Sequence, residues 1–290
     1  MDAAKVVEGA AMKITWPTLL LFLASGIAWM QPKWGVEEDA MRQQGIDLLI
    51  CLDVSNSMLA RDVAPNRLER AKLEVLDLLD GMETDRVGLV LVAGEAQRAA
   101  PLTNDFETYR NLLELASPES VFQGGTQLAS ALEKTRELLQ AAPSQQKFVL
   151  LISDGEDRSR ESVKQAELCR EQGIQVFTLG VGTATGSKIT LTDEEGAEFY
   201  LTDANGNQVL SRFDPITLQQ ISVSTDGVAL TLASDVGVLR RCYQEILLPR
   251  ATQAVASNSE LQRASRFQIF IGIAILAAFV SFSGFGRSKR

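Results

Sequence analysis

From Ile46 onward, short continuous apolar runs alternate with apolar residues set at helical spacing. Runs such as Leu48–Leu52 and Phe148–Ile152 are typical of strands buried on both faces, as in a parallel sheet. Between such runs, apolar residues recur every three or four positions, as in residues 68–79, which is the spacing of a helix with one buried face. The sequence therefore predicts an α/β domain, Rossmann-like, with a mostly parallel central sheet flanked by helices.

The same reasoning gives the elements along the chain. Predicted strands cover Ile46–Leu52, Arg86–Val92, a short edge strand Gln97–Leu102, Phe148–Ile152, Val176–Val181 and Val228–Leu232. Predicted helices cover Leu68–Leu79, Asp105–Leu115, Thr126–Leu139, Ser162–Gln172, Pro215–Ser224 and 235–247.

Between Lys188 and Arg212 the pattern changes to strand-like alternation interrupted by turns. One turn falls at residues 193–196 and another at Asn205-Gly206, a pair that favours hairpins. We predict a small β-meander here, inserted at about residues 183–212 before the last helices. Its acidic residues lack the regular spacing of a calcium-binding loop, which favours ordinary turns.

An apolar segment lies on each side of this domain. Residues 14–30 predict an N-terminal transmembrane or signal-anchor segment, while Lys13 and the small residues Ala24 and Gly26 also permit a cleavable signal peptide. Phe267–Phe285 has no charged residue and precedes a basic tail, which predicts a C-terminal transmembrane helix with a cytoplasmic end. Both interpretations of the first segment place the central domain outside the cytoplasm.

These boundaries give four parts. They are an N-terminal segment at 1–33, the α/β domain at 34–247, a polar tether at 248–266, and the C-terminal helix with its basic tail at 267–290.

Composition excludes several classes of function. The formal net charge is −9, and the centre of the chain has no cluster of Lys and Arg, so nucleic acid is not an expected partner. The chain has no histidine, which removes histidine-based acid–base catalysis and Ser-His-Asp triads. The three cysteines show no metal or redox spacing, and we predict no disulfide.

Candidate metal ligands follow two of the predicted strands. Asp53, Ser55 and Ser57 come directly after the first strand, at a spacing that lets their oxygens converge where the backbone turns. Thr126 follows a pair of glycines, and Asp154 follows the strand that ends at Ile152. Because the carboxyl ends of parallel strands share one edge of a sheet, these oxygens predict a site for Mg²⁺ or Mn²⁺.

The order Asp-x-Ser-x-Ser, then Thr, then Asp resembles the von Willebrand factor A (vWA) domain with its metal-ion-dependent adhesion site, abbreviated MIDAS. The resemblance implies that Ser55, Ser57 and Thr126 offer hydroxyl oxygens, and that Asp53 and Asp154 act mainly through bound water. It also implies an open sixth position, which takes an acidic side chain of a protein partner.

Further stretches are similar to the membrane-bound Bat proteins of this family, in particular the BatB-like (aerotolerance) branch. They are Asp53–Ala60, Pro65–Leu68, Gly94–Ala96 and Pro101–Thr103. This resemblance implies a bacterial inner membrane protein with an extracytoplasmic (periplasmic) vWA domain. It also implies other vWA membrane proteins and a MoxR-type AAA ATPase as partners, in envelope stress tolerance or protein-complex assembly.

Two alternatives to an interaction module stay open at this point. A metal-dependent hydrolase or phosphoesterase would use Asp53 and Asp154, although such sites usually have more carboxylates and often histidine. An outward-facing adhesin is the other alternative, and the short tether argues against its reach. We therefore expect a binding module with no catalytic residues.

Overall fold

The computed structural model describes residues 16–30, 33–36, 45–121, 127–140, 147–157, 160–193, 195–232, 236–258, 263–265 and 267–285. The chain divides into two compact units. One is Arg42–Ala254, and the other combines Met1–Met41 with Val255–Arg290.

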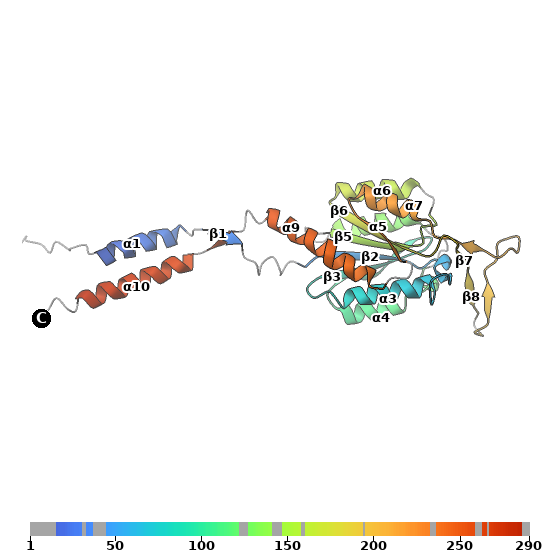
Figure 1. Ribbon diagram of the computed structural model, residues 1–290, viewed down its shortest axis with the longest axis horizontal. Helices are drawn as coiled ribbons and strands as arrows, with labels where there is room; N and C mark the ends of the chain where they lie inside the picture. The colour runs from blue at the N-terminus through green and yellow to red at the C-terminus, as the bar shows by residue number, and fades with distance from the viewer. Residues whose placement is uncertain are drawn as a thin grey trace, which may run out of the picture. The chain divides into compact units, whose positions relative to one another are not determined.

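A six-stranded sheet in the order β11-β6-β5-β2-β3-β4 forms the centre of the larger unit (Figure 1). Neighbouring strands run parallel except at the edge, where β4 is antiparallel to β3. The strands are β2 (Asp47–Asp53), β3 (Arg86–Val92), β4 (Ala96–Thr103), β5 (Lys147–Ser153), β6 (Ile174–Val181) and β11 (Ala229–Leu232). The predicted α/β class, the mostly parallel sheet and the edge strand are confirmed.

Helices cover both faces of this sheet (Figure 1). One face packs against α5 (Leu128–Gln140), α6 (Arg160–Glu171) and α7 (Pro215–Ser224). The other packs against α3 (Arg67–Leu79), α4 (Phe106–Glu114) and α8 (Val238–Cys242). Two short 3-10 helices, η1 (Asn56–Leu59) and η2 (Pro118–Ser120), begin directly after Ser55 and Ser117.

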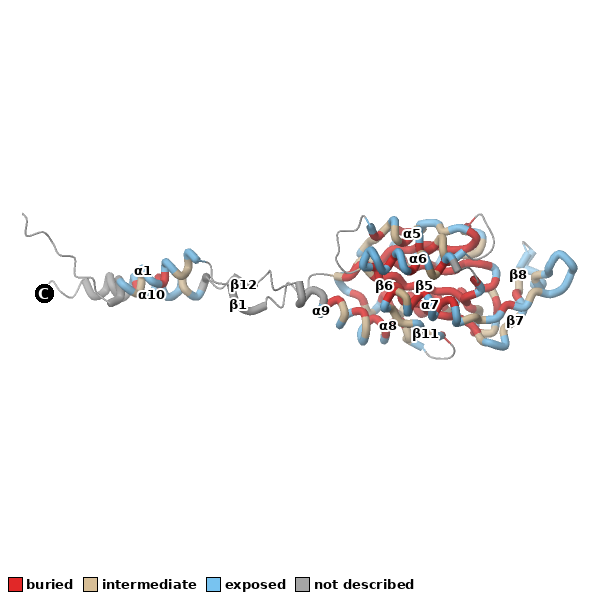
Figure 2. Tube along the Cα trace, turned by 90° about the horizontal axis from the view of Figure 1, so that it is seen from above, coloured by how far each residue is buried: buried red, intermediate tan, exposed pale blue. Residues whose placement is uncertain are grey.

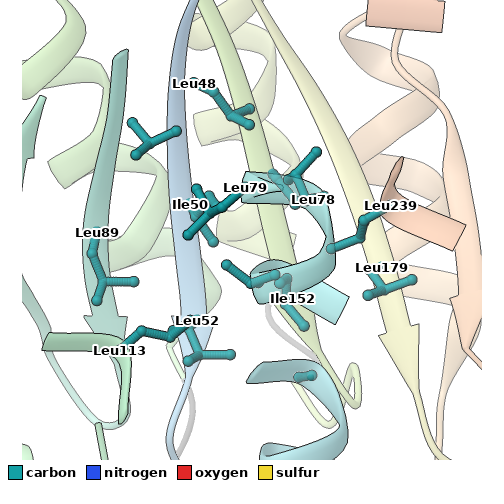
Figure 3. Packing of buried hydrophobic residues seen from close by; sticks show 14 of the residues in the cluster. Leu48, Ile50, Leu52, Leu78, Leu79, Leu89, Leu113, Ile152, Leu179 and Leu239 are labelled. Atoms are coloured by element: carbon teal, nitrogen blue, oxygen red, sulfur yellow. The ribbon is translucent and has the colours of Figure 1, made fainter. Parts of the chain in front are cut away.

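The two hydrophobic cores come from the alternation of side chains along each strand. On β2, Leu48, Ile50 and Leu52 face α3 and α4 (Figure 3). Leu49 and Cys51 face α5 and α6 on the other side of the sheet. All five are essentially inaccessible to solvent, and Figure 2 shows the strands beside them equally buried. This double burial explains why the strands appear in the sequence as continuous apolar runs.

The three cysteines lie in these cores as free thiols, consistent with the prediction of no disulfide. Cys51 lies on β2, Cys169 on α6 and Cys242 at the end of α8. Burial raises the pKa of Cys51 to about 12, so this thiol stays protonated at neutral pH.

Four short strands occupy the predicted meander. They are β7 (Ser187–Lys188), β8 (Thr190–Thr192), β9 (Glu198–Tyr200) and β10 (Leu210–Ser211). β8 pairs with β9 and β7 pairs with β10, both antiparallel. The predicted turn at Asn205-Gly206 is confirmed. Thr202 bridges Gln208 across it, and the N–H groups of Asp203 and Val209 donate to the carbonyls of Asn207 and Leu201 at 2.8 and 2.9 Å.

The last helix of the larger unit continues beyond its predicted end. α8 passes into a π-helical turn, η3 (Tyr243–Leu247), and then into α9 (Leu248–Asn258). The N–H of Leu248 donates to the carbonyl of Tyr243, and this wider turn precedes Pro249, which has no N–H to donate. Residues 248–258, predicted as the start of a polar tether, are therefore helical.

In the described part of the smaller unit, the helices α1 (Trp16–Trp29) and α10 (Phe267–Phe285) lie side by side. The strands β1 (Lys33–Val36) and β12 (Arg263–Ser265) pair with each other. Among the described residues, no helix combines the length and the apolar character that crossing a membrane requires. The two predicted membrane spans are thus not confirmed.

Two buried hydrogen bonds to Asp85 connect the start of the α/β domain to its last helix. The Tyr243 hydroxyl donates to Asp85, and the second oxygen of Asp85 accepts from the Ile46 N–H at 2.7 Å. Tyr243→Phe would leave a buried carboxylate oxygen without its donor, so we expect a loss of about 1–3 kcal/mol in the free energy of unfolding.

Tyr109→Phe is the matched control for that prediction. The Tyr109 hydroxyl is buried without a hydrogen-bond partner among the described residues, so its removal should leave stability unchanged or slightly higher. Urea denaturation of both variants measures the difference. Equal losses in the two variants would contradict the role given to Asp85.

Candidate metal site

The candidate site lies where β2 and β5 end side by side. The parallel register places Leu52 opposite Ile152, so the residues that follow, Asp53 and Ser153, meet at the same edge of the sheet. The Ser153 hydroxyl donates to Asp53 Oδ2 at 2.6 Å, and Asp53 is completely buried. The backbone pairing therefore fixes the Asp53 carboxylate at the carboxyl edge, where parallel α/β sheets form their binding sites.

Two serines turn their hydroxyls toward each other directly after Asp53. The N–H of Ser55 donates to Asp53 Oδ1 at 2.9 Å, which starts the turn into η1. The turn brings Ser55 Oγ and Ser57 Oγ to 2.9 Å from each other, and both residues are nearly buried. The structure thus brings these three side chains together.

Asp154 joins them from the end of β5. It is fully buried, and the nearby Ser57 hydroxyl acts to lower the pKa of its carboxyl. Gly155 is needed next to it: its φ is +77°, and a Cβ there would lie 2.0 Å from the carbonyl oxygen of Asp214. The N–H of Asp214 in turn donates to the Asp154 carbonyl at 2.9 Å, so the loop can turn closely only with glycine at this position.

A buried arginine that the sequence analysis did not assign lies behind Asp154. Arg67, the first residue of α3, has a side chain with no solvent exposure. Its Nη1 lies 2.8 Å from Asp154 Oδ2 and 2.6 Å from Ser211 Oγ. Its Nε and Nη2 both contact the carboxylate of Asp62 at 2.8 Å, in the two-pronged geometry that makes Arg–carboxylate pairs strong. Arg67 thus fixes one oxygen of Asp154 while Asp62 fixes Arg67.

The sequence contains one signal for this arginine. Helix N-termini favour acidic residues, because the helix dipole is positive there. A basic residue at the first position of α3, directly after the N-cap Asn66, is therefore unusual and indicates a compensating carboxylate.

Thr126, with Gly124 and Gly125, lies outside the described residues. The structure does describe Gln127, whose N–H donates to the carbonyl of Ala93 at 3.1 Å, and Leu128, whose N–H donates to Asp157 Oδ2 at 2.9 Å. Asp157 belongs to the loop that carries Asp154, and it is buried. The start of α5 is therefore attached to the loop of the candidate site two residues after Thr126.

Burial and like charge both act on the two aspartates of the site. Burial, with the nearby Asp154 charge, raises the pKa of Asp53 to about 7. Burial also raises the pKa of Asp154, against the opposing effects of the Ser57 hydroxyl and the Arg67 guanidinium. For Asp62, burial is outweighed by Arg67 and by the N–H of Thr183, which hold its pKa below the ordinary value.

The charges of this cluster fit a divalent cation. With Asp53, Asp62 and Asp154 ionised against the single guanidinium of Arg67, the buried cluster carries two units of negative charge. A buried charge of this size is unfavourable unless a cation balances it.

The hydroxyl geometry fits as well. Ligands at about 2.1 Å in an octahedron lie about 3 Å apart along each edge, and the Ser55 and Ser57 oxygens are 2.9 Å apart. Among the described residues, no group of three or more His, Cys, Asp or Glu side chains is placed to hold a metal ion. The candidate site differs in kind, because it combines hydroxyls with two carboxylates.

A central parallel sheet with a hydroxyl and carboxylate cluster at its carboxyl edge defines a domain of the vWA class. A family model of the von Willebrand factor type A domain matches residues 48–156. The structure is similar to BatB from Bacteroides thetaiotaomicron, with a TM-score of 0.67 and 32% identity over 72% of this chain and 100% of that one. An aerotolerance-related membrane protein from Bacteroides fragilis is also 32% identical, with a TM-score of 0.64 over 71% of this chain and 100% of that one.

This chain belongs to the BatB-like family of vWA proteins. Among curated sequences, a protein of Borreliella burgdorferi is 26% identical over 196 residues, which are 66% of this chain and 55% of that protein. The chain thus matches little more than half the length of that relative.

Proposed function

We propose that this protein is a membrane-anchored interaction module that binds an acidic side chain of a partner protein through a divalent cation, Mg²⁺ or Mn²⁺. The observation that carries the proposal is the meeting of Ser55 and Ser57 with two buried aspartates at one edge of the sheet. Domains of this class commonly bind a divalent metal at this edge. Asp53, Ser55, Ser57, Thr126 and Asp154 would hold the ion.

The hydroxyls and the carboxylates have different roles at this site. The Ser55 and Ser57 hydroxyls offer neutral oxygens, so they leave the positive charge of the ion available for an incoming carboxylate. Asp53 and Asp154 are held by Ser153 and Arg67 and can accept hydrogen bonds from water on the ion. When bound, the ion supplies a Lewis-acidic position that attracts an anionic oxygen of the partner.

The cellular setting follows from the family resemblance and belongs to the same proposal. The α/β domain would lie on the periplasmic side of a bacterial inner membrane, anchored by residues 14–30 and Phe267–Phe285. Its partners would be other vWA membrane proteins and a MoxR-type AAA ATPase, in envelope stress tolerance or assembly of protein complexes. Comparing membrane crosslinks with and without EDTA tests whether the ion controls these contacts.

Thr126 supplies a prediction for the metal site. Thr126→Ala should weaken Mg²⁺ binding at least tenfold, because it removes one proposed hydroxyl ligand. Thr192→Ala, at an exposed position on β8, should leave Mg²⁺ binding unchanged. Isothermal titration of the two variants measures this. An unchanged affinity in Thr126→Ala would remove that residue from the ligand set.

One observation keeps a hydrolase as the alternative. A carboxyl pKa of about 7, as at Asp53, is in the range suited to acid–base catalysis. A phosphatase assay with Mg²⁺ or Mn²⁺ separates the two functions. Turnover that is lost in Asp154→Ala would favour the enzyme, whereas the proposed module should show no turnover above background.

A further inference from the structure

The β-meander is joined to the candidate metal site through its two ends. Ile189 pairs with Ala60, three residues after Ser57. At the other end, the Ser211 carbonyl accepts from Arg67 at 3.3 Å, and the N–H of Arg212 donates to Glu156 at 2.7 Å. The residues that position Asp154 therefore also position the meander.

The meander carries a pocket of about 360 Å³. Arg61, Lys188, Glu198, Phe199 and Tyr200 line it, together with smaller polar residues. Phe199 and Tyr200 are about half exposed, at 49% and 48% of the residue surface. Figure 2 shows that much of this part of the chain is exposed, in contrast to the buried strands of the sheet. Exposed rings beside a polar pocket are typical of contact surfaces for other proteins.

The charge of this pocket is opposite to that of the whole chain. Arg61 forms a two-pronged ion pair with Glu198, at 2.6 and 3.0 Å, which neutralises both. The Lys188 ammonium lies 5.1 Å from the centre of the Tyr200 ring and forms no ion pair with any acid in the described part of the chain. The pocket therefore has one unit of excess positive charge on a chain with a formal net charge of −9.

We infer that this pocket binds a second acidic residue of the same partner segment whose first carboxylate reaches the metal. The inference rests on the proposed function. A carboxylate in the pocket would meet the Lys188 ammonium, and the apolar part of the segment would lie against the two exposed rings. Two linked contacts raise the effective concentration of the second, so the segment needs acidic residues at a defined spacing. The metal then provides affinity for any carboxylate, and the pocket determines which partner segments bind.

A peptide array tests the inference with the full 290-residue chain in detergent. Each peptide has one fixed aspartate and random flanking residues, and binding is measured in Mg²⁺ and in EDTA. We expect Mg²⁺-dependent binding that is enriched for Asp or Glu at one spacing from the fixed aspartate. Lys188→Glu should change the preference at that spacing from acidic to Lys or Arg by at least tenfold. Lys134→Glu, which makes the same change of charge at a partly exposed site on α5, should keep the wild-type preference.

The outcomes separate the two claims. If Mg²⁺-dependent binding persists and Lys188→Glu shows the wild-type profile, the pocket has no role and the metal-dependent function stands. If no peptide binds in a Mg²⁺-dependent way, the proposed function fails and the inference fails with it. Because Lys188 is exposed, the variant should unfold at the same temperature as the wild type, and a melting curve verifies this.

Discussion

Arg67→Met is expected to lower the free energy of unfolding by about 3–5 kcal/mol, the range for breaking a buried ion pair by removing one partner. Arg67 is fully buried, and its guanidinium is shared by Asp62 and Asp154. Methionine fills much of the same volume but leaves both carboxylates without their cation. Arg67→Lys should give a smaller loss, because a single ammonium cannot reproduce the two-pronged contact with Asp62. Urea denaturation measures all of these variants.

Arg110→Met is the matched control for this substitution. Arg110 lies on α4 and pairs with Asp80 at the surface, with a third of its side chain exposed. Surface pairs of this kind contribute at most about 1 kcal/mol. If Arg67→Met lowers the free energy of unfolding no more than Arg110→Met does, the ion pairs of Arg67 do not stabilise the site.

The second large effect concerns pH in the absence of metal. The pKa of Asp53 rises from 3.8 to about 7 on folding, because the side chain is buried next to Asp154. Between these values the folded protein holds a proton that the unfolded protein has lost, so stability falls as pH rises through this range. The slope reaches at most about 1.4 kcal/mol per pH unit. Saturating Mg²⁺ should remove the loss, since a cation favours the ionised form.

Asp53→Asn isolates this contribution. The amide has nearly the same shape and no charge to titrate, so the decline in stability of the metal-free protein between pH 5 and 7 should be smaller in the variant than in the wild type. The raised pKa of Asp154 accounts for the decline that remains. Chemical denaturation in EDTA at several pH values gives the comparison. Parallel curves for the two proteins would mean that Asp53 is already ionised without a cation.

The sequence predicted the framework of the fold well because the relevant signals are local. Buried strands appear as apolar runs and helices as spaced apolar faces, so β2, β5 and the loops that follow them could be placed directly. Asp53, Ser55, Ser57 and Asp154 meet as predicted because parallel register at Leu52 and Ile152 determines which strand ends are neighbours.

Contacts between distant parts of the chain could not be predicted in the same way. Arg67 meets Asp154 across 87 positions, and only its unusual place at a helix start indicates a buried partner. The buried Asp157 accepts hydrogen bonds from the Leu128 N–H at the start of α5 and from the Ser162 hydroxyl on α6, and the first of these spans 29 positions. The end of the last helix was missed because Pro249 normally stops a helix, whereas here a π-helical turn precedes it.

Anomalous X-ray diffraction from crystals grown with Mn²⁺ tests the central claim most directly. We expect one strong anomalous peak within about 2.0–2.3 Å of both Ser55 Oγ and Ser57 Oγ, with Asp53 and Asp154 next to it. A peak at another place, or no peak at this edge of the sheet at saturating Mn²⁺, would contradict the account.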